Sequence, residues 1–274
     1  LSLWDKLKLL TFQLSAALIP DLAILLLRHN IKKELGQFIL PYDEFHLPRQ
    51  LAHLKAQDMS INLNHLGETI LCESDADQQT QRYIDSISHK NVQSLSIKLS
   101  SLYSQNKRID IHNTQHILLE RLRRIMRAAL HHHDKKLITF DMEHFEELYL
   151  SISILKVLLE DTEFKNLYLG IALQAYLPES FEIQQILTKW GITRVENGGH
   201  PIRIRLVKGA NLSLERIHAS QNNWHAAAYP NKTLVDANFK RMIHFGTLPQ
   251  HAHAIHLGIG THNVFDIAYT YLER

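Results

Sequence analysis

The sequence Ile202-Arg203-Ile204-Arg205-Leu206-Val207-Lys208-Gly209-Ala210 contains a short strand pattern that runs into a glycine. Arg203, Arg205 and Val207 alternate with apolar residues, so these three side chains are expected on one face of a strand. A glycine directly after a strand lets a ligand approach the backbone closely. This stretch therefore predicts a buried strand that ends at a binding site.

Five other stretches have the same strand pattern, and a helical pattern follows each of the six. The predicted strands are Met59–Leu66, Ser94–Ser101, Lys136–Met142, Leu167–Ala175, Ile202–Val207 and Ala254–Ile259. Strictly alternating strands and helices indicate a parallel α/β sheet, either doubly wound or closed into a (β/α)8 barrel. No G-x-G-x-x-G follows the first strand, which disfavours a dinucleotide-binding sheet. We therefore expect a (β/α)8 TIM-type barrel over 58–274, incomplete at about six repeats, after a helical segment over 1–57.

The helices have specific signals. Ser74 is a candidate N-cap, with Asp75 and Asp77 expected in the first helical turn. Apolar residues at helical spacing predict two buried faces, Leu118, Leu122, Ile125 and Ala129, then Leu148, Ile152, Leu155 and Leu159. Cys72, the single cysteine of the sequence, follows apolar Leu71 and is expected to pack in the core.

Composition excludes several classes of function. The 274 residues are 45% hydrophobic and 21% charged, as in soluble globular proteins, and carry a net charge of +2. No basic stripe with interleaved aromatic residues indicates nucleic-acid binding. The apolar segment Leu9–Leu27 is interrupted at Pro20-Asp21, which argues against a transmembrane span. It predicts two apolar helices packed on the domain; a peripheral contact with a membrane surface is the alternative.

Polar side chains gather at the ends of the predicted strands, where barrels of this class carry their reactive groups. The set is Ser96, Lys98 and Ser100 on the second strand, Asp141 and Glu143 on the third, Gln174 on the fourth, Arg205 on the fifth and Thr261-His262-Asn263 after the sixth. An unpaired charge inside a barrel is very costly. These residues therefore either form a buried salt-bridge network or line a pocket for an anionic ligand.

The sequence contains 19 histidines, which raises the alternative of a metal-dependent barrel hydrolase. His131, His132 and His133 are consecutive on a predicted helix, so their side chains point about 100° apart and do not converge on one ion. His251, His253 and His256 lie before or early in the sixth strand, away from the expected catalytic end. No metal site is therefore expected.

The same strand ends resemble the proline dehydrogenase family in order and spacing. The matching stretches are Asn62–Glu68, Ser96–Ser101, Phe140–Glu143, Leu173–Leu177, Arg205–Leu212, Thr261–Asn263 and the helical Asp236–Met242. The resemblance covers most of Ile31–Arg274 and is greatest to the bacterial branch, found alone or fused to a glutamate-semialdehyde dehydrogenase. It implies a distorted (β/α)8 barrel with noncovalent FAD that oxidises L-proline to 1-pyrroline-5-carboxylate. Hydride would pass to flavin N5 and electrons to a membrane quinone.

The resemblance also implies roles for individual residues. Lys98 and Asp141 would belong to the proline pocket, Leu206 would pack near the substrate, and Arg205 would stabilise charge on the reduced flavin. The flavin contacts would come from Gln174, Arg205, Val207, Lys208, Gly209, Ala210, Thr261, His262 and Asn263. A cytoplasmic enzyme, associated peripherally with the inner membrane as an alternative, is expected.

Two departures from the family pattern leave an alternative open. Asn211-Leu212 stands where many relatives have an aromatic pair. The family's later Tyr and tandem-Arg motif, which holds the proline carboxylate on the eighth repeat, has no counterpart before Arg274. The expectation is therefore a truncated chain that oxidises proline poorly by itself; the alternative is a noncatalytic barrel scaffold.

Overall fold

The computed structural model of the chain describes residues 9–10, 12–13, 19–35, 39, 46–66, 70–105, 110–131, 135–142, 144–209 and 211–273. The chain divides into two compact units, Leu1–Met59 and Ser60–Arg274.

The first unit is helical. It contains α2 (Pro20–Leu35) and α3 (His46–Ala56). Pro20 begins α2 rather than breaking a helix, because the first helical turn needs no backbone N–H from its first residue. Across the described residues, no helix combines the length and the apolar character needed to cross a membrane.

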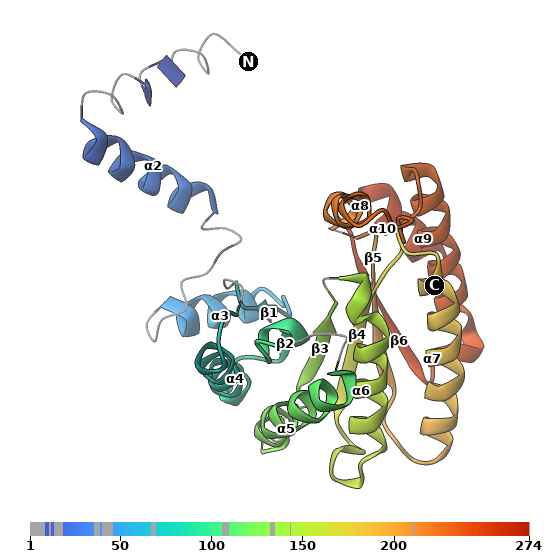
Figure 1. Ribbon diagram of the computed structural model, residues 1–274. Helices are drawn as coiled ribbons and strands as arrows, with labels where there is room; N and C mark the ends of the chain where they lie inside the picture. Colours follow the sequence, from blue (N-terminus) through green and yellow to red (C-terminus); the bar gives the residue numbers. More distant parts are fainter. Residues whose placement is uncertain are drawn as a thin grey trace. The chain divides into compact units, whose positions relative to one another are not determined.

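The second unit contains a six-stranded parallel sheet in which the strands lie in the order of the sequence (Figure 1). The strands are β1 (Asn62–Asn64), β2 (Ser94–Lys98), β3 (Leu137–Asp141), β4 (Tyr168–Gln174), β5 (Ile202–Val207) and β6 (Ile255–Gly260). Every neighbouring pair is parallel. This confirms the predicted α/β fold and all six strands; the sheet is a curled half-barrel.

Helices follow each strand, and several of them pack on the outer face of the sheet (Figure 1). They are α4 (Glu73–Ser88), α5 (Ile111–Leu130), α6 (Leu148–Glu160), α7 (Glu179–Glu196), α8 (Leu212–Gln221), α9 (Lys232–Thr247) and α10 (Val264–Glu273). Within the described residues, short 3-10 turns accompany them at η1 (Leu99–Ser101), η3 (Phe145–Glu147), η4 (Thr162–Phe164) and η5 (Pro249–His251).

The two faces of the sheet differ sharply in chemistry. Alternate strand residues point to the helices and are at most 2% exposed: Leu95, Ile97, Ile138, Phe140, Leu169, Ile171, Leu173, Ile202, Ile204, Leu206 and Ile255. The predicted helical faces on α5 and α6 are buried against this layer, except that Ile152 is half-buried. Burying such apolar side chains is the main favourable term in folding. The opposite, inner face carries mostly polar and small residues.

Several local predictions were wrong. The first strand is only Asn62–Asn64, because its ladder with β2 covers these three residues and no more. The second strand ends at Lys98, and Ser100 lies in η1 rather than on the strand face with Ser96.

The start of α4 also differs from the expectation. The N-cap is Cys72 rather than Ser74, and Asp77 falls after the first turn, which contains Glu73 and Asp75. Because the helix begins at Glu73, Cys72 lies outside its buried face and is exposed, not packed in the core.

Candidate functional site

The inner face of the sheet carries a row of charged residues at one level. Lys98 pairs with Asp141 in the register of β2 and β3, and Ala172 pairs with Arg205 in that of β4 and β5. Phe140 pairs with Ile171, so Asp141 and Ala172, the next residues, are also level. Lys98, Asp141 and Arg205 therefore lie at the same height near the carboxyl ends of their strands.

Arg205 connects strands that are not neighbours in the sheet. Its Nη2 donates to Oδ1 of Asp141 on β3, and its Nη1 donates to Oγ of Ser96 on β2 at 3.3 Å. The same Ser96 oxygen accepts a hydrogen bond from Asn62 Nδ2 on β1 at 2.7 Å. Since β4 and β3 separate β5 from β2, these contacts require the sheet to curl around its inner face. The predicted convergence of Asp141 and Arg205 is confirmed.

Small residues leave the room that this row needs. Ala172 lies beside Arg205 on β4, and Gly258 lies beside it on β6. A Cβ at Gly258 would come within 3.0 Å of the Arg203 side chain, and one at Gly170 would come within 2.7 Å of Arg203 O. The interior is therefore shaped around two arginines instead of being filled by branched apolar side chains, as barrel interiors commonly are.

Two buried polar atoms near this row have no hydrogen-bond partner within the described residues: Gln174 Oε1, an acceptor, and Arg205 Nε, a donor. Gln174 is 4% exposed, and its Nε2 donates to Met142 O, which fixes the amide. Buried polar groups without partners cost free energy. A ligand that offers both a donor and an acceptor would satisfy both atoms.

Lys208, directly after β5, joins the strand to two helices. Its Nζ lies 2.7 Å from Asp236 Oδ1 on α9 and 2.7 Å from Asp266 Oδ2 on α10. Burial by itself lowers the pKa of Lys208, but the two carboxylates outweigh it and raise the pKa, so the ammonium stays charged. These two ion pairs are enough to explain the position and charge of Lys208. Its expected contact with a cofactor stays a prediction.

Gly209 has a backbone conformation that side chains rarely adopt. Its φ is +120°, and a Cβ there would lie 1.5 Å from Tyr176 Cδ1. The glycine is thus needed for the packing of Tyr176, whether or not a ligand approaches. Ala210 and Glu143 lie outside the described residues.

The residues after β6 mainly cap α10. Thr261 Oγ1 donates to Asp266 Oδ2 at 3.2 Å and accepts from Asn263 N, and Asn263 Oδ1 accepts from Phe265 N. His262 is exposed. Val207 lies on the inner face beside Gln174, while Leu206 is fully buried on the helix-facing side. The ligand roles of these residues stay predictions.

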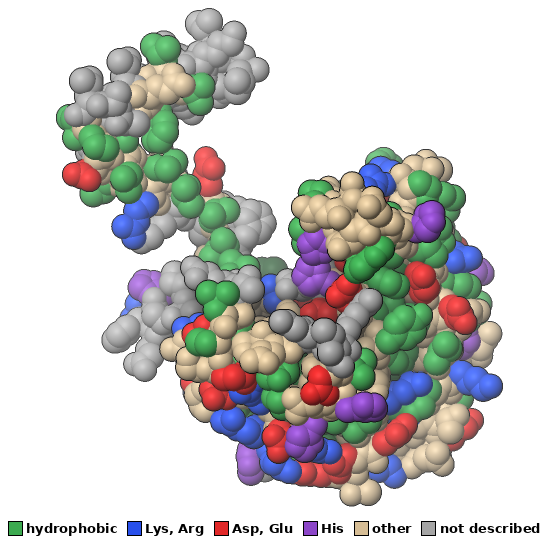
Figure 2. All heavy atoms as spheres, viewed as in Figure 1, with side chains coloured by type: hydrophobic (Ala, Val, Ile, Leu, Met, Phe, Trp, Pro, Cys, Tyr) green, Lys and Arg blue, Asp and Glu red, His purple; other side chains and the backbone are tan. Residues whose placement is uncertain are grey.

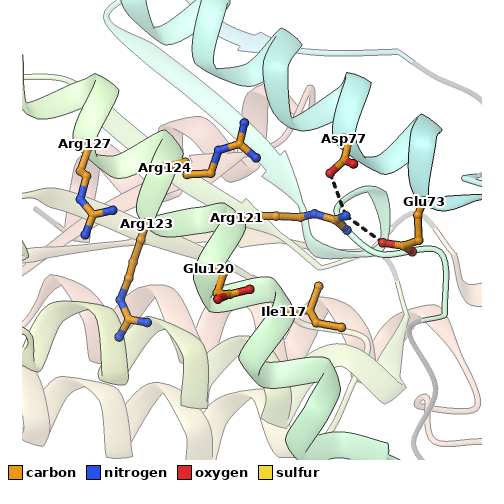
Figure 3. Close-up of a pocket in the computed structure, with 8 residues that line it drawn as sticks. All are labelled: Glu73, Asp77, Ile117, Glu120, Arg121, Arg123, Arg124 and Arg127. Carbon is orange, nitrogen blue, oxygen red and sulfur yellow. Dashed lines mark hydrogen bonds and ion pairs between the residues drawn. The ribbon is translucent and has the colours of Figure 1, made fainter.

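Two hollows in the described part of the second unit lie apart from the row. One, of about 680 Å³, is lined by Glu73, Asp77, Ile117, Glu120, Arg121, Arg123, Arg124 and Arg127 on α4 and α5 (Figure 3). Arg121 contacts Glu73 and Asp77 at 2.8 Å, Arg127 contacts Glu163 at 2.6 Å, and Arg123 lies 3.8 Å from Asp161. Because acidic side chains neutralise most of its arginines, this hollow is not a strong anion site.

The other hollow, of about 560 Å³, is lined on one side by His144, Phe145 and Glu147 after β3, and on the other by His218 and Trp224.

The visible face of the second unit carries basic, acidic and histidine side chains side by side (Figure 2). Within the described residues, no three His, Cys, Asp or Glu side chains gather as metal ligands.

Sequence reasoning missed Tyr83, and it noticed Ser101 and His65 only as members of the motif stretches Ser96–Ser101 and Asn62–Glu68. Tyr83 and Ser101 hydrogen-bond to the backbone of Lys98, and His65 stacks on Tyr83. Their positions carry no periodic signal that links α4 to the end of β2. Asn62 was noticed only as part of a motif, although its place on the inner face follows from strand alternation.

Comparisons with known proteins agree with this geometry. The chain is 28% identical over 209 residues to proline dehydrogenase 2 of Bacillus subtilis (strain 168), covering 75% of this chain and 58% of that protein. Proline utilization A of Corynebacterium freiburgense is similar in structure, with a TM-score of 0.86 and 36% identity over 89% of this chain and 25% of that one. Proline utilization A of Bdellovibrio bacteriovorus, inactivated by N-propargylglycine, gives a TM-score of 0.75 and 28% identity over 82% and 25%.

The chain thus spans little more than half the length of the curated relative and a quarter of each of these two solved relatives. The proline dehydrogenase family model matches residues 47–273, which include all six strands and the inner-face row. The chain belongs to the proline dehydrogenase family.

Proposed function

We propose that the protein oxidises L-proline to 1-pyrroline-5-carboxylate with FAD as cofactor and a quinone as electron acceptor. The observation that supports this most is the level row of Lys98, Asp141 and Arg205, with the unpartnered Arg205 Nε and Gln174 Oε1 beside it. A buried donor and a buried acceptor at the carboxyl ends of adjacent strands suit a ligand in this position.

The residues present fit a flavin. An isoalloxazine ring has both hydrogen-bond donors and acceptors along its edge, so it can serve both Arg205 Nε and Gln174 Oε1. Val207, Lys208, Gly209, Ala210, Thr261, His262 and Asn263 would complete the contacts to FAD. When bound, FAD supplies the hydride acceptor that protein side chains lack.

The protein side chains would bind and orient the substrate. The ammonium of Lys98 would attract the proline carboxylate, and Asp141 would keep the neighbouring cationic groups in place. Asp141 is 13% exposed and Arg205 is 26% exposed. In such a partly buried place, charges interact more strongly than in water. The fixed guanidinium of Arg205 would stabilise negative charge that develops nearby without costly reorganisation.

Partners and location follow the same proposal. A cytoplasmic enzyme that delivers electrons to a membrane quinone needs a peripheral contact with the membrane. Helix α2 supports this, because Ile24, Leu25 and Leu26 are each about half exposed or more, at 55%, 65% and 48%. The similarity to proline utilization A proteins supports a fused or separate glutamate-semialdehyde dehydrogenase as a partner.

The test is spectroscopic. The full-length protein, purified after expression with riboflavin, should be yellow, and L-proline should bleach its flavin absorbance under anaerobic conditions. Lys98→Met should raise the proline concentration needed for half-maximal bleaching. A protein that binds neither FAD nor proline would instead be the noncatalytic scaffold.

A further inference from the structure

The backbone of Lys98 is held by two side chains that lie outside the strands. Ser101 Oγ donates to Lys98 O at 2.7 Å, and Lys98 N donates to Tyr83 OH at 3.4 Å. The Tyr83 and Ser101 hydroxyl oxygens are 3.0 Å apart. Ser101 uses its one hydrogen on Lys98 O, so Tyr83 must donate to Ser101. The three residues form a closed ring with one arrangement of hydrogens.

This ring takes over where the sheet stops supporting Lys98. The pairing of β1 with β2 ends at Asn64 and Ser96, two residues before Lys98. Among the described residues, no strand pairs with the Lys98 peptide groups on that side, and buried peptide groups need partners. The chain also turns from β2 into η1 at Lys98. Tyr83 and Ser101 therefore fix the direction in which the Lys98 side chain leaves the backbone.

The Tyr83 ring is itself held in place. It is 1% exposed and stacks on His65, with ring centroids 5.0 Å apart. Gln79 Nε2 donates to His65 Nδ1 at 3.3 Å, so Nε2 carries the histidine hydrogen and donates to Ser86 Oγ at 2.8 Å. Both partners come from α4, the helix that carries Tyr83. The neutral imidazole of His65 is thus fixed against α4 and restricts movement of the Tyr83 ring.

We infer that Tyr83 is a positioning residue for substrate binding: with Ser101, it aims the Lys98 ammonium at the substrate carboxylate. This rests on the proposed role of Lys98. A carboxylate contact that persists from bound substrate to transition state affects KM and leaves kcat unchanged. Loss of the Tyr83 hydroxyl should therefore raise KM for proline and leave kcat nearly unchanged.

The experiment is a double-mutant cycle in the full-length enzyme. Tyr83→Phe keeps the ring and its stacking, and should raise KM for proline roughly 2- to 10-fold, the effect of one lost hydrogen bond, with kcat within about 2-fold of wild type. Ser101→Ala should give a similar rise. In a Lys98→Met background, Tyr83→Phe should change KM no further. Tyr149→Phe, at a tyrosine that is 61% exposed on α6, is the matched control and should be silent.

Each other outcome is decisive. An unchanged KM in Tyr83→Phe, or an effect that persists in the Lys98→Met background, would overturn the inference while Lys98 keeps its proposed role. If Lys98→Met itself leaves KM unchanged, the proposed role of Lys98 fails and the inference fails with it. Where turnover is too slow to measure KM, a ligand dissociation constant replaces it. Cyclopentanecarboxylate has the ring and carboxylate of proline without the amine, and its binding is followed by the change in flavin absorbance. Thermal melting identifies any variant that misfolds, and Ser101→Ala then carries the test.

Discussion

Arg205 is bound at two nitrogens and unpartnered at the third. Nη1 and Nη2 hold Ser96 and Asp141, whereas Nε is buried without a partner within the described residues. The two held nitrogens are consistent with a structural ion pair. The third is the nitrogen that would serve the flavin under the proposed function.

The substitution Arg205→Met should reduce turnover by roughly 2–4 kcal/mol in activation free energy, because a fixed charge near developing negative charge is lost. Melting temperature should change little by comparison. Arg203→Met is the matched control, since Arg203 lies on the same face one level deeper. Steady-state kinetics and thermal melting of both variants test this. A sharp fall in melting temperature with normal turnover of the folded fraction would show that Arg205 only holds the strands.

Gly209 offers a test of packing at the single-residue scale. Gly209→Ala combines backbone strain at a φ of +120° with a clash against Tyr176, whereas Gly198→Ala, at a φ of +77°, meets only the end of the Lys165 side chain at 3.5 Å. Strain alone costs roughly 1–3 kcal/mol. Urea unfolding should therefore show a larger loss for Gly209→Ala than for Gly198→Ala. Equal losses of unfolding free energy would mean that the Tyr176 side chain moves aside at no measurable cost.

At the scale of elements, strands were easier to predict than their ends. Ile202–Val207 was predicted to the residue, because Pro201 and Gly209 bound an uninterrupted alternation. Leu99–Ser101 was predicted as strand but forms η1, since its apolar pattern does not reveal that the β1 ladder has already ended. The burial of Cys72 was predicted wrongly, because a shift of one residue in the start of α4 decides whether a side chain there faces the core or the solvent.

The sequence likewise identified the strand residues of the candidate site but not the side chains that support them. Polar residues in apolar strands identified Lys98, Asp141, Gln174 and Arg205, since alternation places them on the inner face. The ring of Tyr83, Ser101 and Lys98 could not be predicted, because it depends on how α4 docks against β2. That contact is decided by tertiary packing, which a single sequence does not record.

The contact of His65 with α4 predicts a pH dependence of stability. Burial, aided by the charge of Arg82, lowers the pKa of His65 from 6.5 to about 4. The unfolded chain therefore binds more protons between these values, and folding free energy from this contact is lost as pH falls from about 6.5 towards 4.

Denaturant unfolding at a series of pH values measures this dependence. His65→Gln should flatten the loss of stability between about pH 6.5 and 4 relative to wild type. His116→Gln is the control, because its side chain is 69% exposed. Parallel pH curves for wild type and His65→Gln would contradict the assignment of a buried neutral histidine.

At the scale of the molecule, β1 and β6 are the edges of the described sheet, and α10, which follows β6 and packs against α9, exposes a large apolar surface. Val264, Phe265, Tyr271 and Leu272 are 73–87% exposed. Such a surface together with a strand edge favours association.

Residues 1–274, purified alone, should self-associate, with a sedimentation coefficient that rises with concentration. The double variant Phe265→Ser and Leu272→Ser should reduce this association. Leu71→Ser, at a leucine that is 83% exposed near α4, should not. A chain that stays monomeric at all concentrations would show that this surface is not adhesive.

The strand order has a consequence for synthesis on the ribosome. Every strand pairs with the one made just before it, so no strand has to insert between two that are already in place. Translation is slow compared with the formation of single helices and loops. The sheet can therefore grow one strand at a time at its newest edge. Asp141 of β3 has to wait, however, for Arg205, which emerges two strands later, so this part of the inner face reaches its final electrostatic state only once β5 is in place.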